Sequence, residues 1–213
     1  CWKRLRSKMI TTCRIILGSA SPRRQQLLEG TELPFTVESV NGLDEKHLPP
    51  DTNPDEIPLL LARTKSLAFP MPLETDELLI TADTLVFSES RNAGPDSGWT
   101  VLGKPASTRE AHRMLEQLSG RCHKVITGIC IRLGDQRTHP EPICFSDSSL
   151  VWFMPLLPEE IRYYVSKYKP YDKAGSYGVQ EWIGYIGIER IEGSYFNVMG
   201  FPIHLLWKYL KEL

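Results

Sequence analysis

Leu17 to Gly30 read LGSASPRRQQLLEG, and in this stretch the chain changes from a strand-like pattern to a helix-like one. A short apolar run ends in small residues, and then come Pro22 and two adjacent arginines. Proline is tolerated in the first turn of a helix, and the following leucine pair gives that helix an apolar side before the glycine ends it. The stretch therefore predicts a strand at 14–17, a small-residue turn and a helix beginning near Pro22.

The two arginines, Arg23 and Arg24, stand where this helix begins. The helix dipole already puts partial positive charge there, so two guanidinium groups are unfavourable unless an anion binds. The hydroxyls of Ser19 and Ser21, the turn's backbone N–H groups and the arginine forks are all suited to phosphate oxygens. The alternative is that both arginines are surface residues paired with nearby glutamates. No GxxxxGK[ST] pattern is present, so this is not a Walker phosphate loop.

The rest of the chain alternates between strand-like and helix-like segments. We expect strands over 35–40, 77–87, 100–102, 122–133, 143–153 and 182–192, and helices over 57–69, 107–118, 158–167 and 201–213. Long, hairpin-like strands in mid-chain are not typical of a purely doubly wound sheet. The fold class that we predict is therefore α/β with a mixed, α+β-type sheet.

Composition limits the classes of function. The 213 residues carry a net charge of −1, with an isoelectric point near 6.6, so no global field would hold a nucleic acid or a membrane surface. No apolar run approaches the roughly 20 residues that span a bilayer, and the basic start lacks a signal-peptide core. We predict a cytoplasmic protein without membrane contact.

Residues 1–13 are interpreted as an extension or processing remnant, with a transit peptide as the alternative. Residues 14–213 are interpreted as one domain.

Cysteine usage gives no sign of a disulfide framework. The chain has 5 cysteines, an odd number, and none of them forms a CxxC pair. Neither a disulfide scaffold nor a zinc site is indicated by such spacing. We interpret the cysteines as buried or partly buried thiols in a reducing compartment. They are Cys1, Cys13, Cys122, Cys130 and Cys144.

Three further segments carry residues suited to chemistry. Asp83 leaves the apolar run ELLITADTLVF, where a carboxylate could hold a metal or a water, although it could equally be a turn aspartate. Lys104 lies in a Gly-Lys-Pro turn and suits a phosphate as a point charge, although turn lysines are often only solvated. The loop DKAGSYGVQ at 172–180 has glycines that allow close approach to a ligand. A nucleoside triphosphate with a divalent metal would need both charge signs together.

In this order the motifs resemble those of the Maf family of nucleotide pyrophosphatases. The resemblance covers about residues 14–210, nearly the whole chain. The matching segments are SASPRRQQLLEG, LDE at 43–45, ARTKSLA around Lys65, ITADTLVF, GKP, LSGRCHKVITG from Leu118, YDKAGSYGVQ from Tyr171 and GSYFNVMGFP. The resemblance implies a Maf or ITPase-like fold, in which an elongated mixed sheet flanked by helices forms two lobes around a cleft. It also implies that 14–213 is a single catalytic domain.

The activity that this resemblance implies is hydrolysis of a nucleoside triphosphate to the monophosphate and pyrophosphate, with Mg²⁺, Mn²⁺ or Co²⁺. Asp83 would accept a proton or activate water, and Glu45, also in the catalytic set, would assist with the metal or the water. Asp83 and Glu45 would together hold the metal. The implied phosphate-binding residues are Ser19, Arg23, Arg24, Lys65 and Lys104, of which Lys65 and Lys104 also belong to the catalytic set. Thr84 and Gln180 would select the base, and Asp172 and Lys173 match the family's late Asp-Lys pair. An aspartate with a pKa of about 3.9 is a poor base alone, so it needs the metal.

Within the family, the sequence resembles the dTTP/UTP branch more than the 7-methyl-GTP branch. The residues that resemble it are Pro22 to Arg24, Thr84 and Gln180, and an amide side chain can bond the O4 and N3–H edge of a pyrimidine. The implied role is to keep non-standard nucleotides out of nucleic acids. Lys169 and Glu181 depart from the family pattern, in which an acidic residue and a glycine are usual. These departures weaken the substrate prediction more than the reaction prediction.

Two other functions stay open at the level of sequence. One is a non-catalytic nucleotide- or nucleic-acid-binding regulator of cell division, and the other is a purine pyrophosphatase acting on ITP or 7-methyl-GTP. The presence of Asp83, Glu45, Lys65 and Lys104 argues against an inactive site, and the near-neutral charge argues against general nucleic-acid binding. The resemblance also implies a homodimer with a small-molecule nucleotide as its partner.

Overall fold

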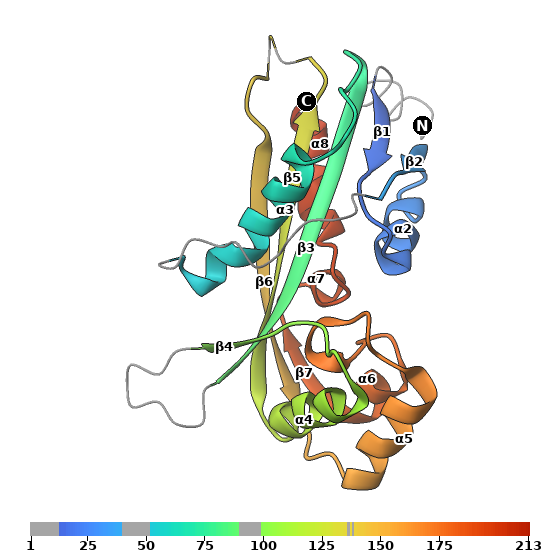
Figure 1. Cartoon of the computed structure of the whole chain (residues 1–213), viewed down its shortest axis with the longest axis vertical. Helices are drawn as coiled ribbons and strands as arrows, with labels where there is room; N and C mark the ends of the chain where they lie inside the picture. Colours follow the sequence, from blue (N-terminus) through green and yellow to red (C-terminus); the bar gives the residue numbers. More distant parts are fainter. Residues whose placement is uncertain (1–12, 40–51, 90–98, 136, 138) are drawn as a thin grey trace. The chain divides into compact units, whose positions relative to one another are not determined.

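The computed structural model describes residues 13–39, 52–89, 99–135, 137 and 139–213. Its elements are shown in Figure 1. The strands are β1 (Arg14–Leu17), β2 (Phe35–Val37), β3 (Glu77–Glu89), β4 (Trp99–Leu102), β5 (Cys122–Leu133), β6 (Ile143–Phe153) and β7 (Ile188–Glu192). The helices are α2 (Pro22–Glu29), α3 (Ile57–Leu67), α4 (Thr108–Leu118), α5 (Pro158–Tyr168), α6 (Trp182–Gly187), α7 (Tyr195–Val198) and α8 (Ile203–Glu212), with 3₁₀ turns η1 (Pro54–Glu56) and η2 (Ala174–Ser176).

The strands pair in a mixed sheet. The pairing order is β2-β1-β3-β5-β6-β7, and β4 pairs with β3 outside this path. β1 is parallel to both β2 and β3, whereas β4 is antiparallel to β3 and β7 is antiparallel to β6. This combination of parallel and antiparallel pairs, flanked by helices, confirms the predicted mixed α+β class.

The chain divides into two compact units. Unit 1 comprises Cys1–Asp83, Thr127–Asp147 and Gly200–Leu213, and unit 2 comprises Thr84–Ile126 and Ser148–Met199. The long strands β3, β5 and β6 each contribute residues to both units. The chain therefore passes from unit 1 to unit 2 twice, between Asp83 and Thr84 and between Asp147 and Ser148.

In unit 1, helices cover both faces of the sheet. Successive side chains of a strand point to opposite faces. On one face, β1, β3 and β5 pack their apolar side chains with those of α2 and α8 in one core cluster, which includes Leu17, Leu28, Ile80 and Leu206. On the opposite face, a Cβ added at Gly128 of β5 would lie 2.5 Å from the α3 backbone. α3 and α8 therefore lie on opposite faces of these strands (Figure 1).

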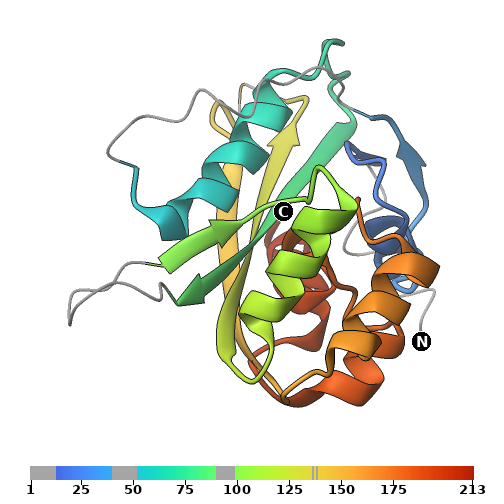
Figure 2. The same cartoon turned by 60° about the horizontal axis from the view of Figure 1, so that its bottom comes forward.

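Unit 2 has its own core beneath α4 and α5. These helices lie side by side, as Figure 2 shows in green and orange. Three buried rings meet in this core: His123 and Tyr177 lie 5.3 Å apart between ring centroids, and Phe153 and Tyr177 lie 5.0 Å apart. His123 Nε2 and the Tyr177 hydroxyl are 2.7 Å apart, within hydrogen-bonding distance.

One sequence prediction is wrong at the element level. Residues 182–192, predicted as extended, form α6 followed by β7. In 182–187, Ile183, Gly184 and Gly187 are buried while Tyr185 and the next residue are exposed, which is a helical burial pattern. A Cβ on Gly184 would lie 1.9 Å from the carbonyl oxygen of Val179, so this short helix packs directly against backbone.

Ser107 caps the start of α4. The Ser107 hydroxyl accepts a hydrogen bond of 3.2 Å from the Glu110 N–H. The Glu110 carboxylate, however, accepts from the Ala106 N–H at 2.8 Å, one residue before the position that a capping box uses. Both bonds still satisfy N–H groups at the entrance to the helix.

Candidate functional site

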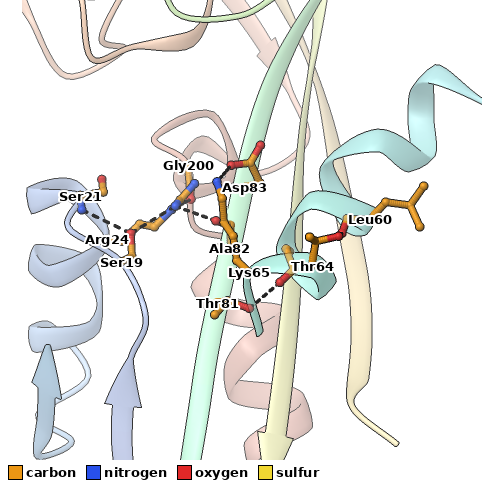
Figure 3. A network of polar contacts seen from close by, with 11 residues as sticks. Ser19, Ser21, Arg24, Leu60, Thr64, Lys65, Thr81, Ala82, Asp83 and Gly200 are labelled. Carbon is orange, nitrogen blue, oxygen red and sulfur yellow. Dashed lines mark hydrogen bonds and ion pairs between the residues drawn. The ribbon is translucent and has the colours of Figure 1, made fainter. Parts of the chain in front are cut away.

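The turn after β1 lies against the middle of β3. β1 and β3 are parallel, with Leu17 opposite Ile80, and the Gly18 N–H donates a hydrogen bond of 2.8 Å to the Ile80 carbonyl. A Cβ at Gly18 would lie 2.8 Å from Thr81 Cγ2, so only glycine fits this close approach. The carboxyl ends of neighbouring parallel strands are where α/β proteins commonly bind ligands. Figure 3 shows the residues gathered here.

Asp83 is paired with Lys65. By strand alternation, Thr81 and Asp83 lie on the same face of β3, the face that α3 covers. The Thr81 hydroxyl donates a hydrogen bond of 2.7 Å to the Ala62 carbonyl of α3, and three residues further along the helix Lys65 Nζ donates to Asp83 Oδ1 (Figure 3). The Lys65 side chain is 16% exposed and that of Asp83 11%. Two predicted catalytic residues therefore form one largely buried ion pair.

Arg24 joins three segments of unit 1. Its Nε donates 2.9 Å to the Gly200 carbonyl, and its Nη1 donates 2.8 Å to the Ala82 carbonyl and 3.2 Å to the Ser19 hydroxyl (Figure 3). Burial lowers the pKa of Arg24, the carboxylate of Asp83 raises it, and the neighbouring Arg23 lowers it. An arginine remains charged in proteins, so the positive charge is held firmly beside Asp83.

The start of α2 has no acidic side chain. Ser21 is the N-cap residue, but its side chain makes no capping bond; its N–H instead donates 3.3 Å to the Ser19 hydroxyl. Ser19 is buried, Arg23 is half-buried, and the first turn of α2 contains no Asp or Glu. This helix end therefore keeps the dipole's positive charge together with two arginines, as an anion site requires.

In unit 2, the Gly-Lys-Pro turn is attached to the 172–180 loop. The Gly103 carbonyl accepts a hydrogen bond of 3.1 Å from the Gly175 N–H. Gly175 has a φ of 67°, and a Cβ there would lie 3.0 Å from the methyl groups of Val86, so both conformation and space favour glycine. Lys104 is exposed in this fixed turn.

The same loop is held by a charge network around one buried lysine. Lys173 is buried, and its Nζ lies 2.8 Å from an Asp172 oxygen and 3.1 Å from a Glu181 oxygen. Glu181 also accepts a hydrogen bond from the Tyr164 hydroxyl, which in turn accepts 3.0 Å from the Gly178 N–H. Burial, together with Glu181, raises the pKa of Tyr164. Sequence reasoning missed Tyr164 and treated Glu181 only as a departure from the family pattern.

Gln180 directly precedes Glu181 of this network in the sequence. Its Oε1 is buried and has no hydrogen-bond partner among the residues that the structure describes. Leaving a buried carbonyl oxygen unpaired costs about 1–3 kcal/mol, so a ligand donor at this atom would be stabilising. Thr84, the other predicted base-selecting residue, is half-buried on β3 directly after Asp83.

The predicted site residues thus fall into two groups. Unit 1 holds Ser19, Ser21, Arg23, Arg24, Lys65 and Asp83, whereas unit 2 holds Thr84, Lys104, Asp172, Lys173 and Gln180. In unit 1, hydrogen bonds link Lys65 to Asp83 and Arg24 to Ser19. In unit 2, they link Gly175 to Gly103 and Lys173 to Asp172. Glu45 lies outside the described residues, so its role in metal binding stays a prediction.

The donor chemistry near Asp83 suits a hard divalent cation only together with a phosphate ligand. In the described ranges there is no group of three or more His, Cys, Asp or Glu side chains that could hold a metal by themselves. Mg²⁺, however, is commonly bound through one or two carboxylates plus substrate phosphates and waters. One carboxylate beside an anion-binding turn fits that arrangement.

Of the helices described, none has the length and apolarity to cross a membrane.

Comparison with known proteins gives the class to which this fold and site belong. Residues 14–213 match the family described as Maf-like protein. The chain belongs to the Maf family. It is 48% identical over 202 residues to the dTTP/UTP pyrophosphatase of Parabacteroides distasonis, covering 93% of this chain and 95% of that protein. It is 45% identical over 201 residues to the dTTP/UTP pyrophosphatase of Bacteroides fragilis, covering 94% and 96%.

Among solved structures, the dITP/XTP pyrophosphatase of Mycobacterium abscessus matches at 14% identity with a TM-score of 0.38, covering 93% of this chain and 95% of that one. This structural similarity is too low to add to the family assignment, which depends on the sequence matches alone.

Proposed function

We propose that this chain hydrolyses dTTP and UTP, and modified pyrimidine nucleotides of the same size, to the monophosphate and pyrophosphate. The observation that carries the proposal is the buried Lys65–Asp83 pair beside the Arg24 and Ser19 turn. Together, the Lys65–Asp83 pair and this turn supply a carboxylate, two cations and a helix start. The chain that carries them is nearly half identical to dTTP/UTP pyrophosphatases. The implied role is to remove non-standard nucleotides before polymerases can use them.

In the proposed reaction a water oxygen attacks the α-phosphorus. A P–O bond forms to that oxygen, the bond to the β-phosphate bridging oxygen breaks, and pyrophosphate leaves. Asp83 takes the water's proton, directly or through a second water. Lys65 holds the carboxylate in place before the reaction. Charge builds on the phosphate oxygens in the transition state, and fixed cations aimed at them supply most of the acceleration.

A divalent cation, when bound, would neutralise phosphate charge and make the attacking water more acidic. The residues that we propose to hold it are Asp83 and Glu45. Arg24 would bind the triphosphate, and because its side chain is already fixed by three hydrogen bonds, little conformational entropy is lost on binding. Lys104, exposed in a rigid turn, would bind the phosphates as a point charge.

Base selection is proposed for Gln180 and Thr84, with Arg23 contributing at the α2 end. The unpaired Gln180 Oε1 would accept a hydrogen bond from the N3–H of thymine or uracil, and the amide N–H would donate to O4. Hypoxanthine and guanine present a similar O6 and N1–H edge, so rejection of the larger purines would depend on the size of the pocket. The Asp172–Lys173–Glu181 network would keep Gln180 in position rather than contact the base itself.

A substrate panel with the full chain tests the proposal. Pyrophosphate release is measured from dTTP, UTP, ITP and 7-methyl-GTP, each with Mg²⁺, Mn²⁺ and Co²⁺. Release from dTTP and UTP but not from the two purine nucleotides is expected. Release chiefly from ITP or 7-methyl-GTP would support the purine alternative. No release from any nucleotide with any metal would support a binding or regulatory protein instead.

Cytoplasmic location, one catalytic domain over 14–213 and a homodimer are proposed on the family resemblance. Multi-angle light scattering of the purified chain tests the dimer, since a mass near the 24.3 kDa of one chain would exclude it.

A further inference from the structure

Two cysteines outside the proposed nucleotide site lie in direct contact. Cys130 on β5 and Cys144 on β6 belong to neighbouring strands of unit 1, and their Sγ atoms are 2.7 Å apart. A covalent S–S bond is about 2.05 Å long, so no other atom lies between these sulfurs and the movement needed to join them is small. Cys130 is buried and Cys144 is half-buried. The pair therefore has one sulfur sheltered and one open to a small reagent.

The surroundings make the two thiols chemically unequal. The hydrogen bond from Cys130 lowers the pKa of the Cys144 thiol, burial raises it, and the nearby Arg63 lowers it. The same hydrogen bond and burial raise the pKa of the Cys130 thiol. Arg63 stands on α3 in an ion pair of 3.1 Å with Glu141. Because the thiolate is the reactive form of cysteine, Cys144 is the nucleophile of the pair and Cys130 remains a thiol.

We propose that Cys130 and Cys144 are a modification site, which hydroperoxides convert reversibly into an intramolecular disulfide. The Cys144 thiolate attacks a peroxide oxygen, the O–O bond breaks, and the chain gains a sulfenic acid while the oxidant leaves as water or an alcohol. The Cys130 sulfur then gives up its proton and attacks the Cys144 sulfur: the S–S bond forms, the S–O bond of the sulfenic acid breaks, and the hydroxyl group leaves as water with that proton. The two steps together oxidise two thiols by two electrons and reduce one hydroperoxide. Thiol reductants reverse the reaction.

A metal site is the other chemistry that two close thiols could serve. Soft metals are usually held by three or four cysteine or histidine ligands, and the described residues contain no group of three such side chains.

The remaining described thiols provide internal controls. Cys122 is half-buried, and burial together with Glu89 and Glu192 raises the pKa of its thiol, so it should react more slowly than Cys144.

Intact-mass measurement and peptide mapping test the site on the full chain treated with hydrogen peroxide. Wild type is expected to lose the mass of two hydrogen atoms and to regain it with dithiothreitol. Arg132 and Arg137 lie between the two cysteines, so trypsin gives separate fragments that stay linked only through the disulfide. Cys144→Ser should lose no hydrogens, whereas Cys130→Ser should accumulate a Cys144 sulfenic acid that dimedone traps. Cys122→Ser should behave as wild type.

Three results would overturn the proposal. The first is a stable dimedone or sulfinic adduct on Cys144 in wild type without loss of hydrogens. The second is a disulfide that maps to Cys13 or Cys122 instead. The third is slower alkylation of Cys144 than of Cys122 by iodoacetamide in the native wild-type protein, a measurement that needs no variant to fold. None of these readouts depends on nucleotide hydrolysis, so the proposed enzymatic function can fail or succeed separately.

Discussion

Lys65 Nζ donates a hydrogen bond to Asp83 Oδ1, and this contact joins α3 to the middle of β3. Both side chains are largely shielded from water, so neither charge would be stable there without the other. The pair therefore combines two tasks in one place: it holds a carboxylate where a phosphate can approach, and it fixes the helix to the strand. The first two predictions separate these tasks.

Replacing Asp83 by Asn removes the proton acceptor while keeping a hydrogen-bonding side chain of the same size. Pyrophosphate release from dTTP is expected to fall by roughly 100- to 10,000-fold, the usual contribution of general acid–base catalysis. Binding of a non-hydrolysable dTTP analogue, measured by calorimetry, should weaken only a few-fold. Glu89→Gln, an exposed carboxylate later on β3, is the matched control and should keep full activity. Full activity in Asp83→Asn would remove Asp83 from the catalytic role.

The structural task of the pair appears in a double-mutant cycle. Lys65→Met leaves the Asp83 carboxylate buried without its partner, and the free energy of unfolding is expected to fall by about 3–5 kcal/mol. Combining Lys65→Met with Asp83→Asn removes both charges and should recover much of that loss. Urea titration of all four proteins gives the coupling energy. Additive losses, with no recovery in the double variant, would mean that the two side chains do not interact in solution.

The strand–turn–helix of 14–30 could be predicted because each residue agrees with the same local structure. The apolar run, the proline and the terminal glycine all act within a few residues of the chain. The α2 arginines carried a signal for an anion, because their charge conflicts with the helix dipole. Most strands and helices were predictable for the same reason, as each has a regular pattern of buried positions.

What the sequence could not show depends on contacts between distant segments. The Cys130–Cys144 contact arises because β5 and β6 are neighbours, and the spacing of the cysteines gives no hint of it. Arg24 was expected to bind phosphate, but its hydrogen bond to the Gly200 carbonyl joins two residues that are 176 positions apart in the sequence, so no local pattern indicates it. The helix at 182–187 was missed because its apolar residues and glycines alternate in a way that resembles a strand. Its glycines instead allow close packing against backbone, a contact that the sequence pattern does not show.

Arg24→Lys tests whether the planar fork at this position is needed. Lysine keeps the charge but cannot bond the Gly200 and Ala82 carbonyls in the same geometry, so the carbonyls lose their donors. The free energy of unfolding should fall by about 1–3 kcal/mol, and pyrophosphate release should fall as well. Arg14→Lys is the control, because the Arg14 side chain is exposed to solvent and its ion pairs with Asp76 and Glu77 contribute little to stability there. Equal stability losses in the two variants would mean that the Arg24 bonds are not formed.

Glu181→Gln tests the charge network that holds the 172–180 loop. The change leaves the buried Lys173 with Asp172 as its carboxylate partner and weakens the hydrogen bond from Tyr164. The free energy of unfolding should fall by about 1–3 kcal/mol. If the loop positions Gln180, KM for dTTP should rise more than kcat falls, since substrate alignment and not proton transfer is affected. Glu189→Gln, exposed on β7, is the control. An unchanged KM in Glu181→Gln would separate this network from nucleotide binding.

Stability should depend on pH through His123. Burial lowers the pKa of His123 from 6.5 to about 3 in the folded protein, so the folded state binds no proton at this imidazole in a range where the unfolded chain does. Since stability rises with pH wherever the unfolded state binds more protons, this residue destabilises the fold progressively as pH falls from about 6.5 to about 3. The loss approaches about 1.4 kcal/mol per pH unit.

His123→Gln removes the titration but keeps a side chain able to bond the Tyr177 hydroxyl. Its free energy of unfolding, measured by urea titration between pH 7 and pH 5, should decline less steeply than that of wild type. The difference in slope isolates the imidazole, because the carboxylates are the same in both proteins. Identical slopes in wild type and His123→Gln would mean that His123 binds a proton in the folded protein as readily as in the unfolded chain, and would contradict the prediction.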